Sequence, residues 1–273
     1  MECLMQRLWH TTILRENEQH IMAETAYLDS RIERRAVMRV ETDSLETVEA
    51  WLERLGRPGN MLENREYIEG LKGVPAYLGS GSQLKKGMQE IKDELERSLF
   101  NECVIGIVQA ETFLFNERGY SSADEYSKSW EEFYAGSCRY YSNLDKIKLS
   151  WGDYIGPTGR GLNLFNRSKS QQLMYDIKGD FIINGSLIDS FHQVSSHLVL
   201  DQDMKVISAH GQLLRAPDRV CFDAAAAMNN LIGISLPGIN KKELANLLGA
   251  GQGCVHLIDL VYDSVKTVEL YIP

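Results

Sequence analysis

The chain of 273 residues is 44% hydrophobic and 25% charged, a composition typical of folded globular proteins that excludes collagen-like and disordered chains. Its 29 Lys and Arg against 38 Asp and Glu give a formal charge of -9, the wrong sign for a surface that binds nucleic acid phosphates. The longest nearly apolar stretch, Val104 to Ala110, is far shorter than the roughly 20 residues of a membrane span. We therefore predict a cytoplasmic protein with neither a nucleic-acid nor a membrane partner.

Short motifs of the first hundred residues reappear in the same order in the last hundred. Leu28-Asp29-Ser30 returns as Ile188-Asp189-Ser190, and residues 37–43 match residues 197–203 in residue type. Further matches pair Gly70–Val74 with Asn230–Ile234, Lys85–Lys86 with Lys241–Lys242, and Cys103–Val104 with Cys254–Val255. The order predicts an internal duplication. We expect a degenerate first copy over 1–112, a bridging insert over 113–163 and a second copy over 164–273.

The pattern within the first copy and the insert predicts two helices. One is expected from Gln83 to Leu95, after the turn residues Gly79 to Gly81. The insert is rich in Tyr and Trp, and the spacing of Trp130, Phe133 and Tyr134 indicates a second helix. Packing in a core explains these aromatic residues better than the lining of a ligand site does.

The second copy shows its elements most clearly. Short alternating or β-branched segments predict strands at 181–188, 194–200 and 205–214. Helical spacing predicts three helices: one after Pro217-Asp218, one over Asn240 to Leu248 and one after the glycine-rich loop 249–253. The expected fold class is therefore α+β, with two tandem diverged copies that each contain a three-strand antiparallel sheet and three helices.

Two of the five scattered cysteines are candidate site residues. Cys254 follows glycines 249, 251 and 253 and opens a helix, where the helix dipole stabilises a thiolate; it also lies on the apolar stripe of that helix, as a core residue would. Cys221 stands in the first turn of its own helix, so that both thiols can be core neighbours, a redox pair or metal ligands. We take Cys221 and Cys254 as candidate metal ligands, and Gly251, Gly253, Cys254 and His256 as a candidate ligand-binding loop.

The second copy resembles an uncharacterised bacterial domain family. The resemblance rests on Asp176 to Asp180, Leu187-Ile-Asp189, Cys221 and the box Gly253-Cys-Val-His-Leu257, which is usually Gly-Cys-Thr-His-Leu in that family. The family implies no activity.

A more distant similarity, in the order of elements, links the chain to the NifU-like scaffolds of iron-sulfur cluster assembly. It implies a NifU-like fold in which Cys221 and Cys254 match two of three cluster cysteines. No residue of this chain matches the first, although His192 and His197 lie near its place.

These observations leave the cofactor and the enzymatic status open. We expect a non-enzymatic binding protein whose small-molecule, metal or protein partner is held near the loop from Gly249 to Cys254. One alternative is a thiol-ligated metal or iron-sulfur carrier that uses Cys221 and Cys254. The other is a thiol-dependent enzyme with Cys254 as its nucleophile.

Overall fold

The computed structural model describes residues 1–56, 64–156 and 159–271, and the chain divides into two units. Unit 1 contains residues 1–8, 127–157 and 168–273, and unit 2 contains residues 9–126 and 158–167. The predicted division into 1–112, 113–163 and 164–273 stays a prediction.

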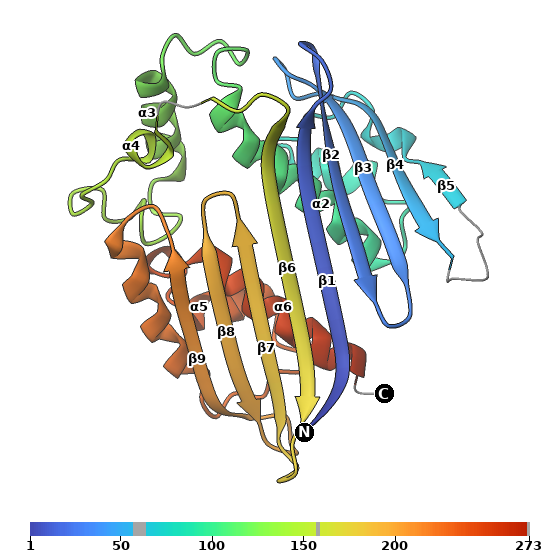
Figure 1. The fold of residues 1–273 in the computed structure, drawn as a ribbon, viewed down its shortest axis with the longest axis vertical. Coiled ribbons are helices and arrows are strands. Elements are labelled where there is room, and N and C mark those ends of the chain that lie inside the picture. The colour runs from blue at the N-terminus through green and yellow to red at the C-terminus, as the bar shows by residue number, and fades with distance from the viewer. Residues whose placement is uncertain (57–63, 157–158, 272–273) are drawn as a thin grey trace. The chain divides into compact units, whose positions relative to one another are not determined.

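Nine strands form one sheet in the order β5-β4-β3-β2-β1-β6-β7-β8-β9 (Figure 1). The expected pair of separate three-stranded sheets is therefore wrong, and so is the NifU-like arrangement built on it. Neighbouring strands pair antiparallel from β2 to β5 and from β7 to β9. The strands are β1 (Glu2–Arg15), β2 (His20–Asp29), β3 (Glu33–Glu41), β4 (Thr47–Leu55), β5 (Asn64–Tyr67), β6 (Asn163–Tyr175), β7 (Phe181–Asp189), β8 (Gln193–Leu200) and β9 (Val206–Arg215).

Strand β6 was not predicted from the sequence, because polar residues occupy its inward-facing positions. Arg167, Lys169 and Gln171 alternate along β6 and are buried, so the usual alternation of apolar and polar residues is absent. Each has a partner within its own unit: the Lys169 ammonium lies 2.7 Å from Asp263, and the Gln171 amide donates to the carbonyl oxygen of Leu260. Strand β1 buries Arg7 in the same way, with a hydrogen bond of 3.0 Å to Thr267.

The helices of unit 2 begin and end at identifiable residues. The predicted single helix over Gln83 to Leu95 is wrong, because α1 ends at Gly87 and α2 starts at Glu94, where the Asp93 carboxylate accepts hydrogen bonds from the Leu95 and Glu96 amides. A Cβ on Gly87 would lie 2.4 Å from the Gly70 carbonyl oxygen, so this close approach requires glycine. The helices of the chain are η1 (Glu69–Leu71), α1 (Gly81–Gly87), α2 (Glu94–Ala110), η2 (Glu111–Phe113), α3 (Ala123–Tyr134), α4 (Trp151–Ile155), η3 (Arg219–Leu231), α5 (Lys241–Leu247), η4 (Ala250–Gln252) and α6 (Val255–Tyr271), where η marks a 3₁₀ helix.

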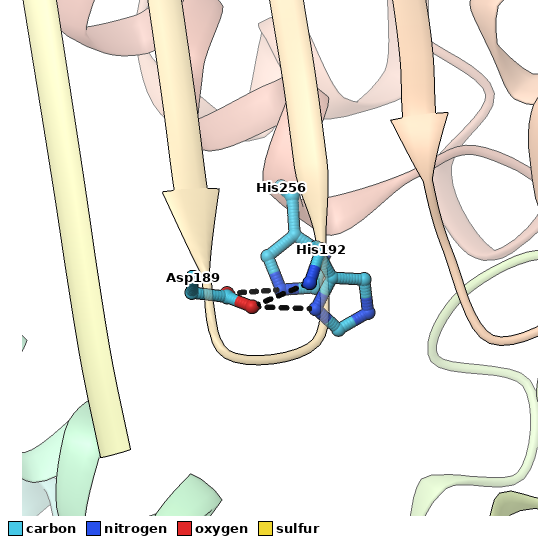
Figure 2. Close-up of side chains that lie close together, drawn as sticks. All are labelled: Asp189, His192 and His256. Carbon is cyan, nitrogen blue, oxygen red and sulfur yellow. Dashed lines mark hydrogen bonds and ion pairs between the residues drawn. The ribbon is translucent and has the colours of Figure 1, made fainter. Parts of the chain in front are cut away.

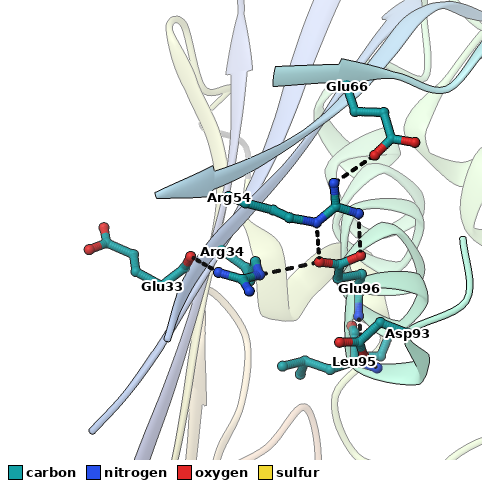
Figure 3. A network of polar contacts seen from close by, with 8 residues as sticks. Glu33, Arg34, Arg54, Glu66, Asp93, Leu95 and Glu96 are labelled. Carbon is teal, nitrogen blue, oxygen red and sulfur yellow. Dashed lines mark hydrogen bonds and ion pairs between the residues drawn. The ribbon is translucent and has the colours of Figure 1, made fainter. Parts of the chain in front are cut away.

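A network of ion pairs joins α2 to the sheet of unit 2 (Figure 3). The Arg54 guanidinium makes two parallel hydrogen bonds of 2.7 Å to the Glu96 carboxylate, and Arg34 adds a third of 3.2 Å. Glu96 is only 3% exposed, whereas Glu66, which also accepts from Arg54, lies at the surface. The buried carboxylate is thus compensated by two arginines from neighbouring strands, as a buried charge requires.

The predicted strands of the second copy are confirmed as β7, β8 and β9, and α5 and α6 lie where helices were expected. Strand β8 alternates strictly between half-buried and buried residues. The predicted stripe of α6 is buried as expected: Leu257, Leu260, Val261, Val265 and Val268 are each at most 1% exposed. The helix expected after Asp218 is a 3₁₀ helix, η3, and the Asp218 carboxylate accepts a hydrogen bond from the Val220 amide at its start. These helices pack against one side of the strands and form the core of unit 1.

Aromatic side chains from residues 127–157 pack within unit 1. Trp130 stacks on Tyr134 at 4.7 Å, and Trp151 of α4 meets the ring of Phe191 edge to face at 5.0 Å. Trp130 and Trp151 are each at most 5% exposed, which fits the expected packing role. Among the described residues, no helix combines the length and the apolar character needed to cross a bilayer.

Candidate functional site

The turn between β7 and β8 is built around Asp189. Its Oδ1 accepts hydrogen bonds from the backbone amides of Phe191, at 2.8 Å, and His192, at 2.6 Å. Aspartate at the first position of a turn favours this arrangement, because its short side chain reaches the amides two and three residues further along. The Asp189 side chain is fully buried. The turn therefore fixes both the carboxylate and the backbone of His192.

Two histidines face this carboxylate, as Figure 2 shows. His192 Nδ1 lies 3.2 Å from Asp189 Oδ1, and His256 Nε2 lies 3.9 Å from Asp189 Oδ2. The two imidazole rings stack with centroids 3.9 Å apart and planes inclined by 29°. His192 is the last residue of the turn, directly before β8, and His256 lies in the first turn of α6, so the fold brings together residues more than 60 positions apart.

The three side chains form a group that fits a metal ion. One potential ligand atom from each of Asp189, His192 and His256 lies within 4.8 Å of the other two. Within the ranges that the structure describes, it is the one place where three His, Cys, Asp or Glu side chains converge so closely. The side chains of His192 and His256 remain 10% and 12% exposed, which leaves the imidazoles within reach of solvent.

Cys254 lies beside this group. Its Sγ is 4.0 Å from His256 Nδ1, so the structure brings together two of the four residues of the predicted ligand-binding loop. Burial raises the pKa of the Cys254 thiol to about 11 and that of Cys221 to about 12. Both thiols are therefore protonated near neutral pH, which favours the role of Cys254 as a core residue over the thiolate that a helix start would stabilise.

The predicted metal pair, Cys221 and Cys254, shares the hydrophobic core of unit 1. No third ligand joins them in the described part of the chain within the spacing that unites Asp189 with the two histidines. Their role as metal ligands stays a prediction.

Gly251 and Gly253 contact the chain's own backbone. A Cβ on Gly251 would lie 2.2 Å from the Gly136 carbonyl oxygen, and a Cβ on Gly253 would lie 2.1 Å from the Leu248 carbonyl oxygen. The carbonyl groups of both glycines accept hydrogen bonds from Ser142 and Arg139. Close packing thus accounts for these glycines without a ligand.

This packing predicts the effect of adding one methyl group. Gly253→Ala is expected to lower the free energy of unfolding by about 2 kcal/mol, the cost of forcing extra volume into a closed contact. Gly159→Ala is the matched control, because no atom lies within 4 Å of its added Cβ. Urea denaturation of the two variants measures the difference. Equal stability of both variants would contradict the packing role of Gly253.

Sequence reasoning found one member of the three-residue group and came close to the others. His256 was a candidate binding residue, whereas Asp189 entered only as part of a repeated motif and His192 only as a residue near a missing cysteine. Asp189 and His192 could have been found from a local pattern. An Asp three residues before a His, at the junction of two predicted strands, places both side chains at one turn. Which helix would face that turn is set by the tertiary fold.

Comparisons with known proteins give one match. A family model described as "Protein of unknown function (DUF2889)" matches residues 172–269, a segment that contains Asp189, His192 and His256. No curated protein and no solved structure matches the chain. This match agrees with the expected resemblance of the second copy to an uncharacterised family. Neither the Gly-Cys-Thr-His-Leu box nor the similarity to NifU-like scaffolds has support, and the function is unknown.

Proposed function

We propose that this protein binds a divalent transition-metal ion, with Zn²⁺ as the test ion, through Asp189, His192 and His256. The observation that carries the proposal is the convergence of one carboxylate and two imidazoles within 4.8 Å at a single turn. Imidazole nitrogen and carboxylate oxygen are ligands that Zn²⁺ and its neighbours in the first transition row accept. The proposal concerns unit 1 alone.

The three side chains must move closer together to bind an ion. Ligands about 2.0–2.2 Å from Zn²⁺ in a tetrahedron lie roughly 3.3–3.6 Å from one another, whereas one ligand atom from each of the three side chains lies within 4.8 Å of the other two. The separations of 3.2 and 3.9 Å join the two histidines to different oxygens of Asp189. A histidine ligand points its nitrogen lone pair at the ion within the plane of the ring. We therefore expect one imidazole to turn out of the present stack when the ion binds.

Three protein ligands leave at least one coordination position open. This is the ligand count of zinc sites that take water or a small molecule, whereas closed structural sites have four protein ligands. The partial exposure of both histidine side chains supports access to that position. The proposal thus keeps the expected small-ligand or metal site near Cys254 and moves its centre to the β7–β8 turn.

The two thiol alternatives have weaker support. A carrier that uses Cys221 and Cys254 would have to deprotonate two thiols whose pKa burial raises to about 12 and 11. A nucleophilic Cys254 needs a lowered pKa, and His256 Nδ1 lies 4.0 Å from its sulfur, beyond the reach of a strong hydrogen bond. We rank both below the Asp189 site.

A diverged internal duplication remains part of the proposal. Asp29 accepts hydrogen bonds from the amides of Arg31 and Ile32 just as Asp189 does from Phe191 and His192. Ile32 thus stands where unit 1 has His192. The aligned pair Cys103 and Cys254 fits less well, because Cys103 lies inside α2 and Cys254 precedes α6. Asp29 therefore provides an internal control turn that lacks the histidine.

Calorimetric titration of chelator-treated protein with Zn²⁺ tests the proposal. We expect one ion per chain, and at least about 100-fold weaker binding after His192→Ala or His256→Ala, because each removes a direct ligand. His197→Ala is the matched control: His197 lies in β8, the strand that follows His192, and bonds to Asn184 at 2.7 Å. Absence of binding by the unaltered chain, or equal binding by the His192→Ala and His197→Ala variants, would refute the site.

A further inference from the structure

Two side chains from outside the β7–β8 turn hold its backbone. Arg215 Nη2 donates to the carbonyl oxygens of Asp189 and His192, the latter at 3.4 Å. The hydroxyl group of Tyr154 donates to the carbonyl oxygen of Phe191. Carbonyl groups at three positions of the turn that carries two candidate ligands are thus bound by donors from other elements.

The two donors come from different parts of unit 1. Arg215 is the last residue of β9 and pairs across the ladder with Gln193, the residue after His192. Tyr154 lies in α4, whose Trp151 packs edge to face on Phe191 at 5.0 Å. Strand β9 and helix α4 therefore both fix the position of this turn.

The corresponding turn in unit 2 has a leucine at the register position of Arg215. Asp29 binds the two amides that follow it, with distances of 2.7 and 2.8 Å. The residue paired with Glu33 there is Leu55, at the register position that Arg215 holds opposite Gln193. Among the residues that the structure describes, Arg215 thus occupies this register position beside the turn that bears a histidine, and Leu55 occupies it beside the turn that bears Ile32.

We infer that Arg215 and Tyr154 are positioning residues of the metal site. They hold the backbone from Asp189 to His192 so that the carboxylate and the His192 ring stay directed at His256. The inference rests on the proposed function and adds two residues to it. Groups that orient metal ligands typically change metal affinity by about 10–100-fold when they are removed.

Zn²⁺ affinity, measured by competition with a chromophoric chelator, tests these roles with Arg215→Met and Tyr154→Phe. We expect each variant to bind about 10–100-fold more weakly than the unaltered chain, and Arg215→Lys to recover part of the loss, because lysine can still donate to a carbonyl group. The absorption spectrum of bound Co²⁺ is expected to change in the same variants, since it reports ligand geometry. If Arg215 and Tyr154 contributed only to the stability of the fold, the folded variants would keep both the Zn²⁺ affinity and the Co²⁺ spectrum of the unaltered chain.

Arg219→Met and Tyr175→Phe are the matched controls: Arg219 is exposed, as Arg215 is, but begins η3, and Tyr175 is exposed at the end of β6, beside Phe181 at the start of β7. Both controls are expected to bind Zn²⁺ as the unaltered chain does. If the unaltered chain binds Zn²⁺ and the Arg215→Met and Tyr154→Phe variants bind it equally well, the positioning roles are refuted and the site stands. If the unaltered chain binds no Zn²⁺, both the metal site and the positioning roles are refuted.

Discussion

Asp189→Ala is expected to abolish Zn²⁺ binding and to lower the free energy of unfolding of the metal-free chain by about 3 kcal/mol. The substitution removes the charged ligand and leaves two buried backbone amides without their acceptor, and each hydrogen bond to a charged group contributes about 1.5–3 kcal/mol. Urea unfolding of the metal-free chain measures the stability, and calorimetric titration measures the binding. Asp189→Asn keeps an oxygen acceptor, so we expect it to remain folded while losing the anionic ligand.

Asp29→Ala provides the comparison within the same molecule. Its carboxylate makes two equivalent hydrogen bonds to backbone amides and accepts a third, of 2.7 Å, from the hydroxyl group of Tyr27. Ser30 and Arg31 are exposed, so water can reach the freed amides of the turn. We expect a loss of about 1–2 kcal/mol and unchanged Zn²⁺ affinity. Equal effects of Asp29→Ala and Asp189→Ala on binding would show that the ion does not bind at the β7–β8 turn.

Glu96→Ala is expected to destabilise unit 2 by about 2–3 kcal/mol. The carboxylate is 3% exposed and is bound by Arg54 through two hydrogen bonds and by Arg34 through one, so its removal leaves two guanidinium groups without their shared partner. Breaking a fully buried ion pair costs about 3–5 kcal/mol. Because the side chains of Arg34 and Arg54 are 19% and 31% exposed, partial rehydration lowers the expected cost. Equilibrium unfolding followed by circular dichroism measures it.

Glu66→Ala tests whether the loss of stability expected for Glu96→Ala comes from the burial of that ion pair or from the presence of an ion pair with Arg54 alone. Glu66 accepts a hydrogen bond of 2.6 Å from the same Arg54, but its side chain is 49% exposed. Exposed pairs contribute about 0–1 kcal/mol, so we expect little change in stability. A loss as large as that of Glu96→Ala would contradict the assignment of Glu96 as the centre of the network.

The sequence predicted the elements of unit 1 better than their assembly. Strands β7 to β9 and helix α6 follow from alternation and from a helical stripe, because their buried residues are apolar. Strand β6 could not be predicted in this way, because Arg167, Lys169 and Gln171 occupy its buried positions and pair with groups distant in the sequence. Because β1 and β6 were not predicted as strands, we expected two short sheets, whereas the structure has one sheet of nine strands.

The candidate site was predictable in part. His256 was found through its place beside Cys254 and the glycine loop, although the glycines serve backbone packing. Asp189 and His192 are joined by a local turn that the sequence does indicate. Their convergence with His256 depends on how α6 packs against β7 and β8, a tertiary arrangement that residue spacing does not encode.

The ligand atoms around a bound Zn²⁺ ion test the central proposal most directly. X-ray absorption spectroscopy of the Zn²⁺-loaded protein is predicted to show a first shell of nitrogen and oxygen at about 2.0–2.2 Å, with the multiple-scattering signature of imidazole and no sulfur. Sulfur scatterers at about 2.3 Å would contradict the Asp189, His192 and His256 site and would transfer the ion to the thiols of Cys221 and Cys254.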